Sequence, residues 1–240
     1  MAPHADDDGG LRAACLAAAR ATIAERGLEQ LSLREVARRL GVSHQAPYKH
    51  FASRDHLLAE VIRQCFQDFA RHLDDREAQE GPQQDLACLG TQYLAYALAH
   101  PLEYRLMFNT TWPEPAEEVG LVQDALHAFN ILRDDLKRIH GVRADSPGPN
   151  VEVDQDAMLI WSAMHGLSSI LQSSAMLHLD LAPGVRERVP QFIMDSVRGL
   201  LQSREDQASQ SPAAALEPVS RPRTPKRTRR SPAPPNTGSS

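Results

Sequence analysis

Residues Leu31 to Phe51 have the sequence LSLREVARRLGVSHQAPYKHF, and the predicted fold depends on them most. Ser32 and Glu35 have the spacing of a capping box, so a helix should begin just after Ser32. Apolar residues recur at helical spacing over the next two turns. Gly41 follows at the point where a left-handed residue can end a helix and turn the chain. Ser43 can then cap a second helix.

That second helix is predicted to be short, over residues 44–50, and its polar side chains are unusual for a core helix. Two helices joined by a turn of three or four residues have the docking geometry of helix-turn-helix DNA-binding proteins. The alternative is an αα-hairpin with a polar surface. On the DNA-binding interpretation, Ser32 and Ser43 bond phosphates, and His44 and Gln45 approach base edges. Tyr48, Lys49 and His50 hold the DNA backbone. Arg34 and Ala46 complete the predicted set of DNA contacts.

The same residues carry a family resemblance. The pattern L-x-x-V-A-x-x-L-G-V-S-x-x-x-x-Y-x-H-F, followed after Ala52 by S-R-D-x-L-L, resembles the DNA-binding domain of TetR-type transcriptional regulators. The resemblance implies a three-helix domain over residues 11–60, with its helix-turn-helix motif at 32–51. Pro47 departs from the family, in which an aliphatic residue is more usual. Proline gives up an N–H that would bond back to Ser43, so individual DNA contacts do not transfer directly.

Charge is distributed in a way that fits this interpretation. The net charge of the 240 residues is −5, but residues 11–60 hold eight Lys/Arg against five Asp/Glu. The cationic excess therefore lies on the predicted DNA-binding head, where phosphate contacts help to position a domain.

Composition excludes several other classes of protein. With 42% apolar residues the chain can bury a sizeable core. It has no run of eighteen apolar residues and begins with an acidic segment, so neither a membrane-spanning nor a secreted protein is expected. The three cysteines, Cys15, Cys65 and Cys88, contain no C-x-x-C pair. This indicates a reducing cytoplasm without disulfides or a zinc site, although redox sensing by one thiol is an alternative.

Enzyme motifs are absent from the sequence. It contains no G-x-S-x-G, H-E-x-x-H, G-x-x-x-x-G-K-[ST] or G-x-G-x-x-G pattern. We therefore expect no catalytic residue, no metal site, no cofactor and no enzymatic activity.

The remaining chain predicts further helices, so the expected fold class is all-α, with a helical bundle over residues 61–202 behind the N-terminal domain. Apolar spacing and Pro or Gly breaks place the helices at 11–26, 54–77, 86–99, 101–108, 116–140, 153–178 and 185–201. The ends of the chain, 1–10 and 203–240, are predicted to be disordered.

The predicted helix over 153–178 is apolar around more than half of its circumference, so it should be buried on two sides. One side can face the core, and the other can face a partner subunit. Together with the helix over 185–201, it could form a four-helix interface with two-fold symmetry. The alternative is a single monomeric core.

The body carries a second, looser resemblance. The run H-P-x-x-Y-R-x-M-F at 100–108 and the pattern W-x-x-x-H-G at 161–166 are similar to the effector domain of a TetR subgroup named for that tryptophan, histidine and glycine. The resemblance implies an internal small-molecule cavity and dimerisation through the last two helices. The expected ligand-binding residues are Phe66, Phe69, Tyr93, Tyr96, Phe108, Trp112, Trp161 and His165, each of which could instead be an ordinary core residue.

The tail contains one distinctive segment, Arg221–Arg230, in which six of ten residues are Lys or Arg. It could touch DNA non-specifically or have no role. The sequence therefore predicts a homodimeric repressor that a small molecule releases from a palindromic DNA operator. The alternatives are a helical dimeric interaction protein without operator binding and a helical-bundle enzyme that uses His165.

Overall fold

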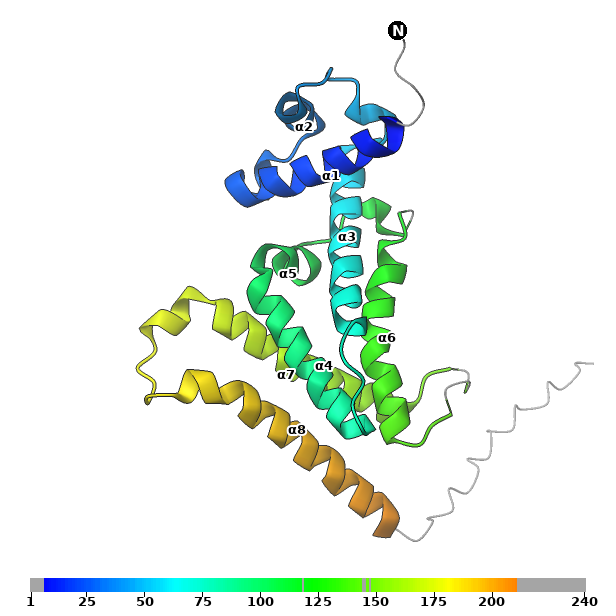
Figure 1. The fold of residues 1–240 in the computed structure, drawn as a ribbon, viewed down its shortest axis with the longest axis vertical. Helices are drawn as coiled ribbons and strands as arrows, with labels where there is room; N and C mark the ends of the chain where they lie inside the picture. The colour runs from blue at the N-terminus through cyan, green and yellow to red at the C-terminus, as the bar shows by residue number, and fades with distance from the viewer. Residues whose placement is uncertain (1–6, 118, 144–145, 147, 211–240) are drawn as a thin grey trace, which may run out of the picture.

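The computed structural model describes residues 7–117, 119–143, 146 and 148–210, and these form helices and loops without a strand (Figure 1). The predicted all-α fold class is confirmed. None of the helices in this described part is long and apolar enough to cross a bilayer. The α-helices are α1 (Asp7–Arg26), α2 (Leu33–Leu40), α3 (Arg54–Asp74), α4 (Pro82–Ala99), α5 (Pro101–Phe108), α6 (Leu121–Ile139), α7 (Val151–Gln172) and α8 (Val185–Gln210).

Helix α3 connects a small head, formed by α1 and α2, to the larger body that contains α4 to α8 (Figure 1). It begins at Arg54 after the predicted cap Ser53, whose side-chain oxygen accepts a hydrogen bond from the backbone N–H of His56 at 3.0 Å. Its apolar residues are buried along the whole length, from Leu57 to Leu73. A single helix therefore contributes to the cores of both parts.

The head is a three-helix arrangement in which α1 and α2 pack against the first half of α3. Its centre contains the fully buried side chains of Leu16, Ile23, Val36, Phe51 and Leu57. The guanidinium of Arg54 donates to the backbone carbonyls of Leu28 and Leu31, both at 3.0 Å, and so ties α3 to the segment between α1 and α2.

Several element boundaries differ from the prediction. Helix α1 begins at Asp7, inside the segment 1–10 that was predicted to be disordered. Helix α4 begins at Pro82 rather than 86, because proline suits the first turn of a helix. Helix α6 begins at Leu121 rather than 116, because Gly120 has a left-handed φ of 79° and separates α6 from a short 3-10 helix at Glu114–Ala116.

The C-terminal helices also differ. Helix α7 ends at Gln172, and a 3-10 helix at Ser174–His178 follows it. Helix α8 continues through Pro190 and past the predicted end at 201 to Gln210. Its extension is held by an ion pair between Arg204 and the fully buried carboxylate of Asp156 on α7. Residues 203–210 are therefore helical, and the rest of the predicted tail, including the basic segment, lies outside the described residues.

Candidate DNA-binding face and effector cavity

The first helix of the helix-turn-helix, α2, is capped at both ends. The Ser32 side-chain oxygen accepts from the backbone N–H of Glu35 at 3.1 Å, as the capping-box pattern predicted. The Glu35 carboxylate pairs with Arg26 and Arg38 and does not complete the box. Gly41 has the expected left-handed conformation, with φ 68° and ψ 24°, which turns the chain towards the recognition segment.

The recognition segment is not the regular α-helix that was predicted over 44–50. It is a turn followed by a 3-10 helix at Pro47–Lys49. Pro47 has no N–H to bond back to the carbonyl of Ser43, so the backbone closes tighter rings instead. The N–H of Ala46 bonds to Ser43 O at 3.0 Å, and that of Lys49 bonds to Ala46 O at 3.2 Å.

The predicted DNA-contacting side chains nevertheless lie on the outside of the head. Pro47 is buried and anchors the segment, while Tyr48 beside it is 47% exposed. Arg34, Ser43, His44, Gln45 and Lys49 are also exposed, whereas Ser32, Ala46 and His50 are partly buried. The segment thus presents a neutral and cationic polar surface, which suits contact with phosphates and base edges.

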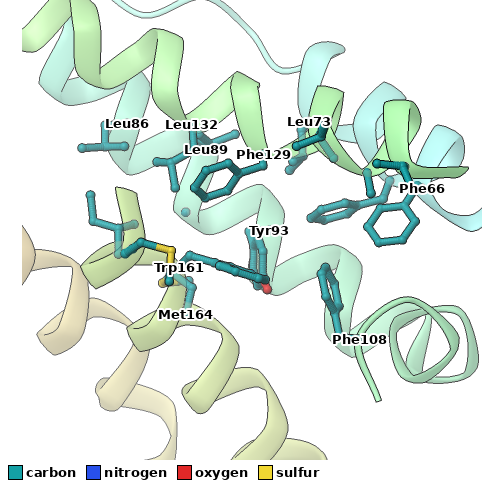
Figure 2. A pocket seen from close by; sticks show the side chains of 18 of the residues that line it. Phe66, Leu73, Leu86, Leu89, Tyr93, Phe108, Phe129, Leu132, Trp161 and Met164 are labelled. Carbon is teal, nitrogen blue, oxygen red and sulfur yellow. The ribbon is translucent and has the colours of Figure 1, made fainter. Parts of the chain in front are cut away.

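The body contains an apolar cavity of about 330 Å³ between α3, α4, α6 and α7 (Figure 2). Six of the eight predicted ligand-binding residues line it, namely Phe66, Phe69, Tyr93, Phe108, Trp112 and Trp161. Edge-on ring contacts hold several of these in place. Phe66 lies 5.5 Å from Trp112 between ring centroids, and Phe69 lies 5.4 Å from Tyr93.

Tyr96 and His165 do not line the cavity, contrary to expectation. Tyr96 is buried against Phe69, with ring centroids 5.1 Å apart, and its ring lies 4.5 Å from that of His100. The His165 ring stacks on Tyr104 at 5.6 Å, and its Nδ1 shares a hydrogen bond of 2.7 Å with the Tyr104 hydroxyl. Burial lowers the pKa of His165, so its imidazole is neutral at pH 7.

Other lining residues were missed by sequence reasoning. They are mainly aliphatic or methionine side chains from α4, α6 and α7, including Leu86, Leu89, Val122, Leu126, Phe129, Leu132, Met158 and Met164. The only signal was their helical spacing, which core residues share. Leu126 and Met158 are 54% and 50% exposed, so the cavity reaches the surface between α6 and α7.

A series of ion pairs runs from the head to the wall of this cavity. Arg12 of α1 pairs with Glu60 of α3 at 2.5 Å, and Glu60 is only 6% exposed. Arg63, one turn later on α3, lies 3.4 Å from Glu60 and donates from Nε to Asp124 of α6 at 2.8 Å. Asp124 lies between Val122 and Ala125, two lining residues. Charged groups therefore connect the head to the cavity wall.

Helices α7 and α8 expose large apolar side chains. Among the described residues of α7, α8 and the segment between them, the exposed large apolar side chains are Val151, Met158, Leu159, Ile170, Leu179, Leu181, Phe192 and Leu200. Val151 and Phe192 are the most exposed of this apolar face, both at 71%. No group of three or more His, Cys, Asp or Glu in the described part of the chain could hold a metal ion.

Comparison with known proteins assigns the family. Residues 16–61 match the family model for bacterial regulatory proteins of the tetR family, and residues 86–197 match the model of the tetracyclin repressor-like C-terminal domain. The chain is 26% identical over 117 residues to the HTH-type transcriptional regulators Rv1816 of Mycobacterium tuberculosis and Mb1846 of Mycobacterium bovis. This alignment covers 46% of the chain and spans about half of those relatives, 50% of their length.

Solved structures agree with this assignment. The regulatory protein SCO4313 is 26% identical with a TM-score of 0.66, and the alignment covers 82% of this chain and 100% of that one. A protein of unknown function from Rhodococcus sp. RHA1 is 27% identical with a TM-score of 0.63, over 80% of this chain and 94% of that one. The family models describe regulators rather than enzymes. The chain belongs to the TetR family of bacterial transcriptional regulators.

Proposed function

We propose that this chain is a dimeric transcriptional repressor of the cytoplasm that leaves a palindromic operator when a small molecule fills the body cavity. The main support for this proposal is that α3 belongs both to the head and to the wall of the cavity. Its first half packs in the core of the head, and Phe66, Phe69 and Leu73 in its second half line the cavity. A ligand that changes the packing of these rings would act on the helix that supports the DNA-binding head.

The operator would be contacted by the recognition segment. Gln45 is exposed and can read adenine through two hydrogen bonds, so it is our candidate for sequence discrimination. Lys49 and Tyr48 are exposed beside it and would hold the phosphate backbone. The 3-10 helix at Pro47–Lys49 sets the spacing between these exposed side chains.

Dimerisation would place two such heads on one duplex. The exposed apolar faces of α7 and α8 are suited to pairing with the same helices of a second copy around a two-fold axis. Two heads related in this way would enter successive major grooves of a palindrome.

Release by a ligand would be a shift between two arrangements of the heads. The ligand can change DNA affinity only by as much as it prefers one arrangement over the other. In addition to the backbone of α3, a series of side-chain ion pairs connects the body to the head. It runs from Asp124 on α6 through Arg63 and Glu60 on α3 to Arg12 on α1.

The test is a binding titration, by fluorescence anisotropy, with DNA from upstream of the protein's own gene and with scrambled DNA. Gln45→Ala should reduce discrimination between the two by about 1–3 kcal/mol. Lys49→Ala should weaken both alike and reduce the salt dependence. Arg71→Ala, which removes an exposed charge of α3 outside the recognition segment, is the matched control.

If Gln45→Ala and Lys49→Ala bind as the wild type does, the recognition segment does not face DNA. The favoured function would then be that of a helical dimeric interaction protein that kept the fold without operator binding.

A further inference from the structure

Tyr93 brings a hydroxyl group to the wall of an otherwise apolar cavity. The residue lines the cavity from α4 and is 8% exposed. Its hydroxyl lies 2.8 Å from that of Tyr104 on α5, which in turn lies 2.7 Å from Nδ1 of His165 on α7. Three helices thus contribute to one hydrogen-bonded chain that starts at the cavity wall and ends at His165.

The other polar groups of the lining are few. Among the described residues around the cavity, none carries a charged side chain. The indole N–H of Trp112 is already used, because it donates to the carbonyl of Met107 at 3.0 Å. The indole of Trp161 lies beside the Tyr93 oxygen (Figure 2), to which its N–H donates, so this N–H is used as well. The polar character of the cavity is therefore concentrated at Tyr93.

The chain can present either hydrogen-bonding role at this point. A neutral imidazole has one N–H and one acceptor nitrogen. If Nδ1 of His165 accepts from Tyr104, Tyr104 accepts from Tyr93, and the Tyr93 oxygen, which already accepts from Trp161, has its second lone pair left to accept from a ligand. If Nδ1 carries the proton, every bond reverses and the Tyr93 O–H can donate. A tyrosine hydroxyl can take more than one bond, so its bond to Tyr104 does not exhaust it.

We propose that Tyr93 is the polar anchor of the cavity, and that the effector is an uncharged, largely apolar molecule with one alcohol or ketone oxygen placed at the Tyr93 hydroxyl. Tyr104 and His165 are positioning residues, since they orient that hydroxyl without lining the cavity. A carboxylate or an ammonium group does not fit, because burying a charge without a partner is costly. The inference rests on the proposed function, in that it takes the cavity to be the effector site.

Binding to the cavity can be measured without DNA. The chain has two tryptophans, Trp112 and Trp161, and both line the cavity, so their fluorescence reports directly on its occupancy. The probes are 1-decanol, 2-decanone, 1-decene and decanoate, which share a chain length. The wild type should bind the alcohol and the ketone about tenfold more tightly than the alkene, and decanoate most weakly.

Tyr93→Phe keeps the ring and removes the anchor. It should bind 1-decanol about tenfold more weakly than the wild type, with unchanged affinity for 1-decene. Tyr96→Phe is the matched control, because Tyr96 is also buried on α4 but lies outside the cavity, and it should bind every probe like the wild type. Thermal unfolding establishes that each variant is folded, and if Tyr93→Phe is not, the ranking of probes by the wild type decides.

Three results overturn the inference. If the wild type binds 1-decene as tightly as 1-decanol, or if Tyr93→Phe leaves the preference for the alcohol intact, Tyr93 is not the anchor and the cavity remains a general apolar site. If no probe changes the tryptophan emission, the cavity does not take such ligands. This last result contradicts both the anchor role of Tyr93 and the use of the cavity as an effector site, while DNA binding is judged separately by the operator titration.

Discussion

Phe192 on α8 provides a quantitative test of the proposed dimer. A phenylalanine side chain can bury about 150–250 Å², so a residue that is 71% exposed leaves roughly 110–180 Å² of its surface to be covered by a partner. At about 25 cal/mol per Å², covering it would contribute about 3–4.5 kcal/mol per protomer. A two-fold interface contains the residue twice, so the two copies together would contribute about 6–9 kcal/mol as an upper limit.

Phe192→Ala removes most of this apolar surface and should leave the fold of the isolated chain almost unchanged, because the ring is exposed there. If only half of the area is covered in the dimer, the loss is still about 3 kcal/mol, and the dissociation constant should rise by more than about a hundredfold. Sedimentation velocity over a series of protein concentrations measures this change.

Leu98→Ala is the control for that experiment. Leu98 is a 45% exposed apolar residue on α4, which lies outside the proposed interface, so its truncation should leave the dimer unaffected. The proposed dimer is refuted if the wild type sediments as a monomer at all concentrations. It is equally refuted if Phe192→Ala dimerises like the wild type, since the largest exposed ring of α8 would then have no partner.

Three further predictions concern stability. Gly27→Ala should lower the free energy of unfolding by about 1–3 kcal/mol, because the backbone angles φ 87° and ψ 164° suit only glycine. Gly199→Ala should raise the free energy of unfolding by about 0.5–1 kcal/mol, because Gly199 lies inside α8 with open space around it. Denaturant titrations measure both changes. A double-mutant cycle of Asp124→Asn and Arg63→Met should give a coupling energy of about 1 kcal/mol, and a value near zero would remove this pair from the connection between head and body. The backbone N–H of Gln79, and after it Arg138, lowers the pKa of Asp85 in the folded protein. The stabilisation from this carboxylate is therefore present above the pKa of Asp85 in the unfolded chain, and it is lost as pH falls through the lower pKa of the folded protein. Asp85→Asn should flatten the loss of stability at acid pH, measured by unfolding at a series of pH values.

The caps of the head could be predicted because their signals are local. Ser32, Gly41 and Ser53 act on residues within four positions of themselves, so the pattern contains the whole interaction. The recognition segment was predicted wrongly as a helix for an equally local reason. Pro47 removes one N–H in the middle of a seven-residue stretch, and too few intact bonds remain to hold it as an α-helix.

The cavity was less accessible from sequence, since its lining is decided by packing between helices. Tyr93 and Tyr96 are one turn apart on α4, yet only Tyr93 reaches the cavity, while Tyr96 packs against His72 and His100. The spacing of Trp161 and His165 placed both on one face of α7, but His165 turns towards Tyr104. Periodicity identifies the buried side of a helix and does not identify which neighbour covers each residue.

The position of buried charge explains how a cavity in the body can act on the head. Glu60, in the first half of α3, is nearly inaccessible to solvent, and it pairs with two cations, Arg12 from α1 and Arg63 from its own helix. Moving α1 away from α3 would leave this carboxylate buried with one partner fewer, which costs far more than losing an exposed ion pair. Arg63 is shared with Asp124 of α6, the helix that contributes Val122 and Ala125 to the cavity wall, so displacement of α6 also disturbs the neutralisation of Glu60. Because a buried charge tolerates only well-paired arrangements, the head and the cavity wall are expected to move together rather than independently.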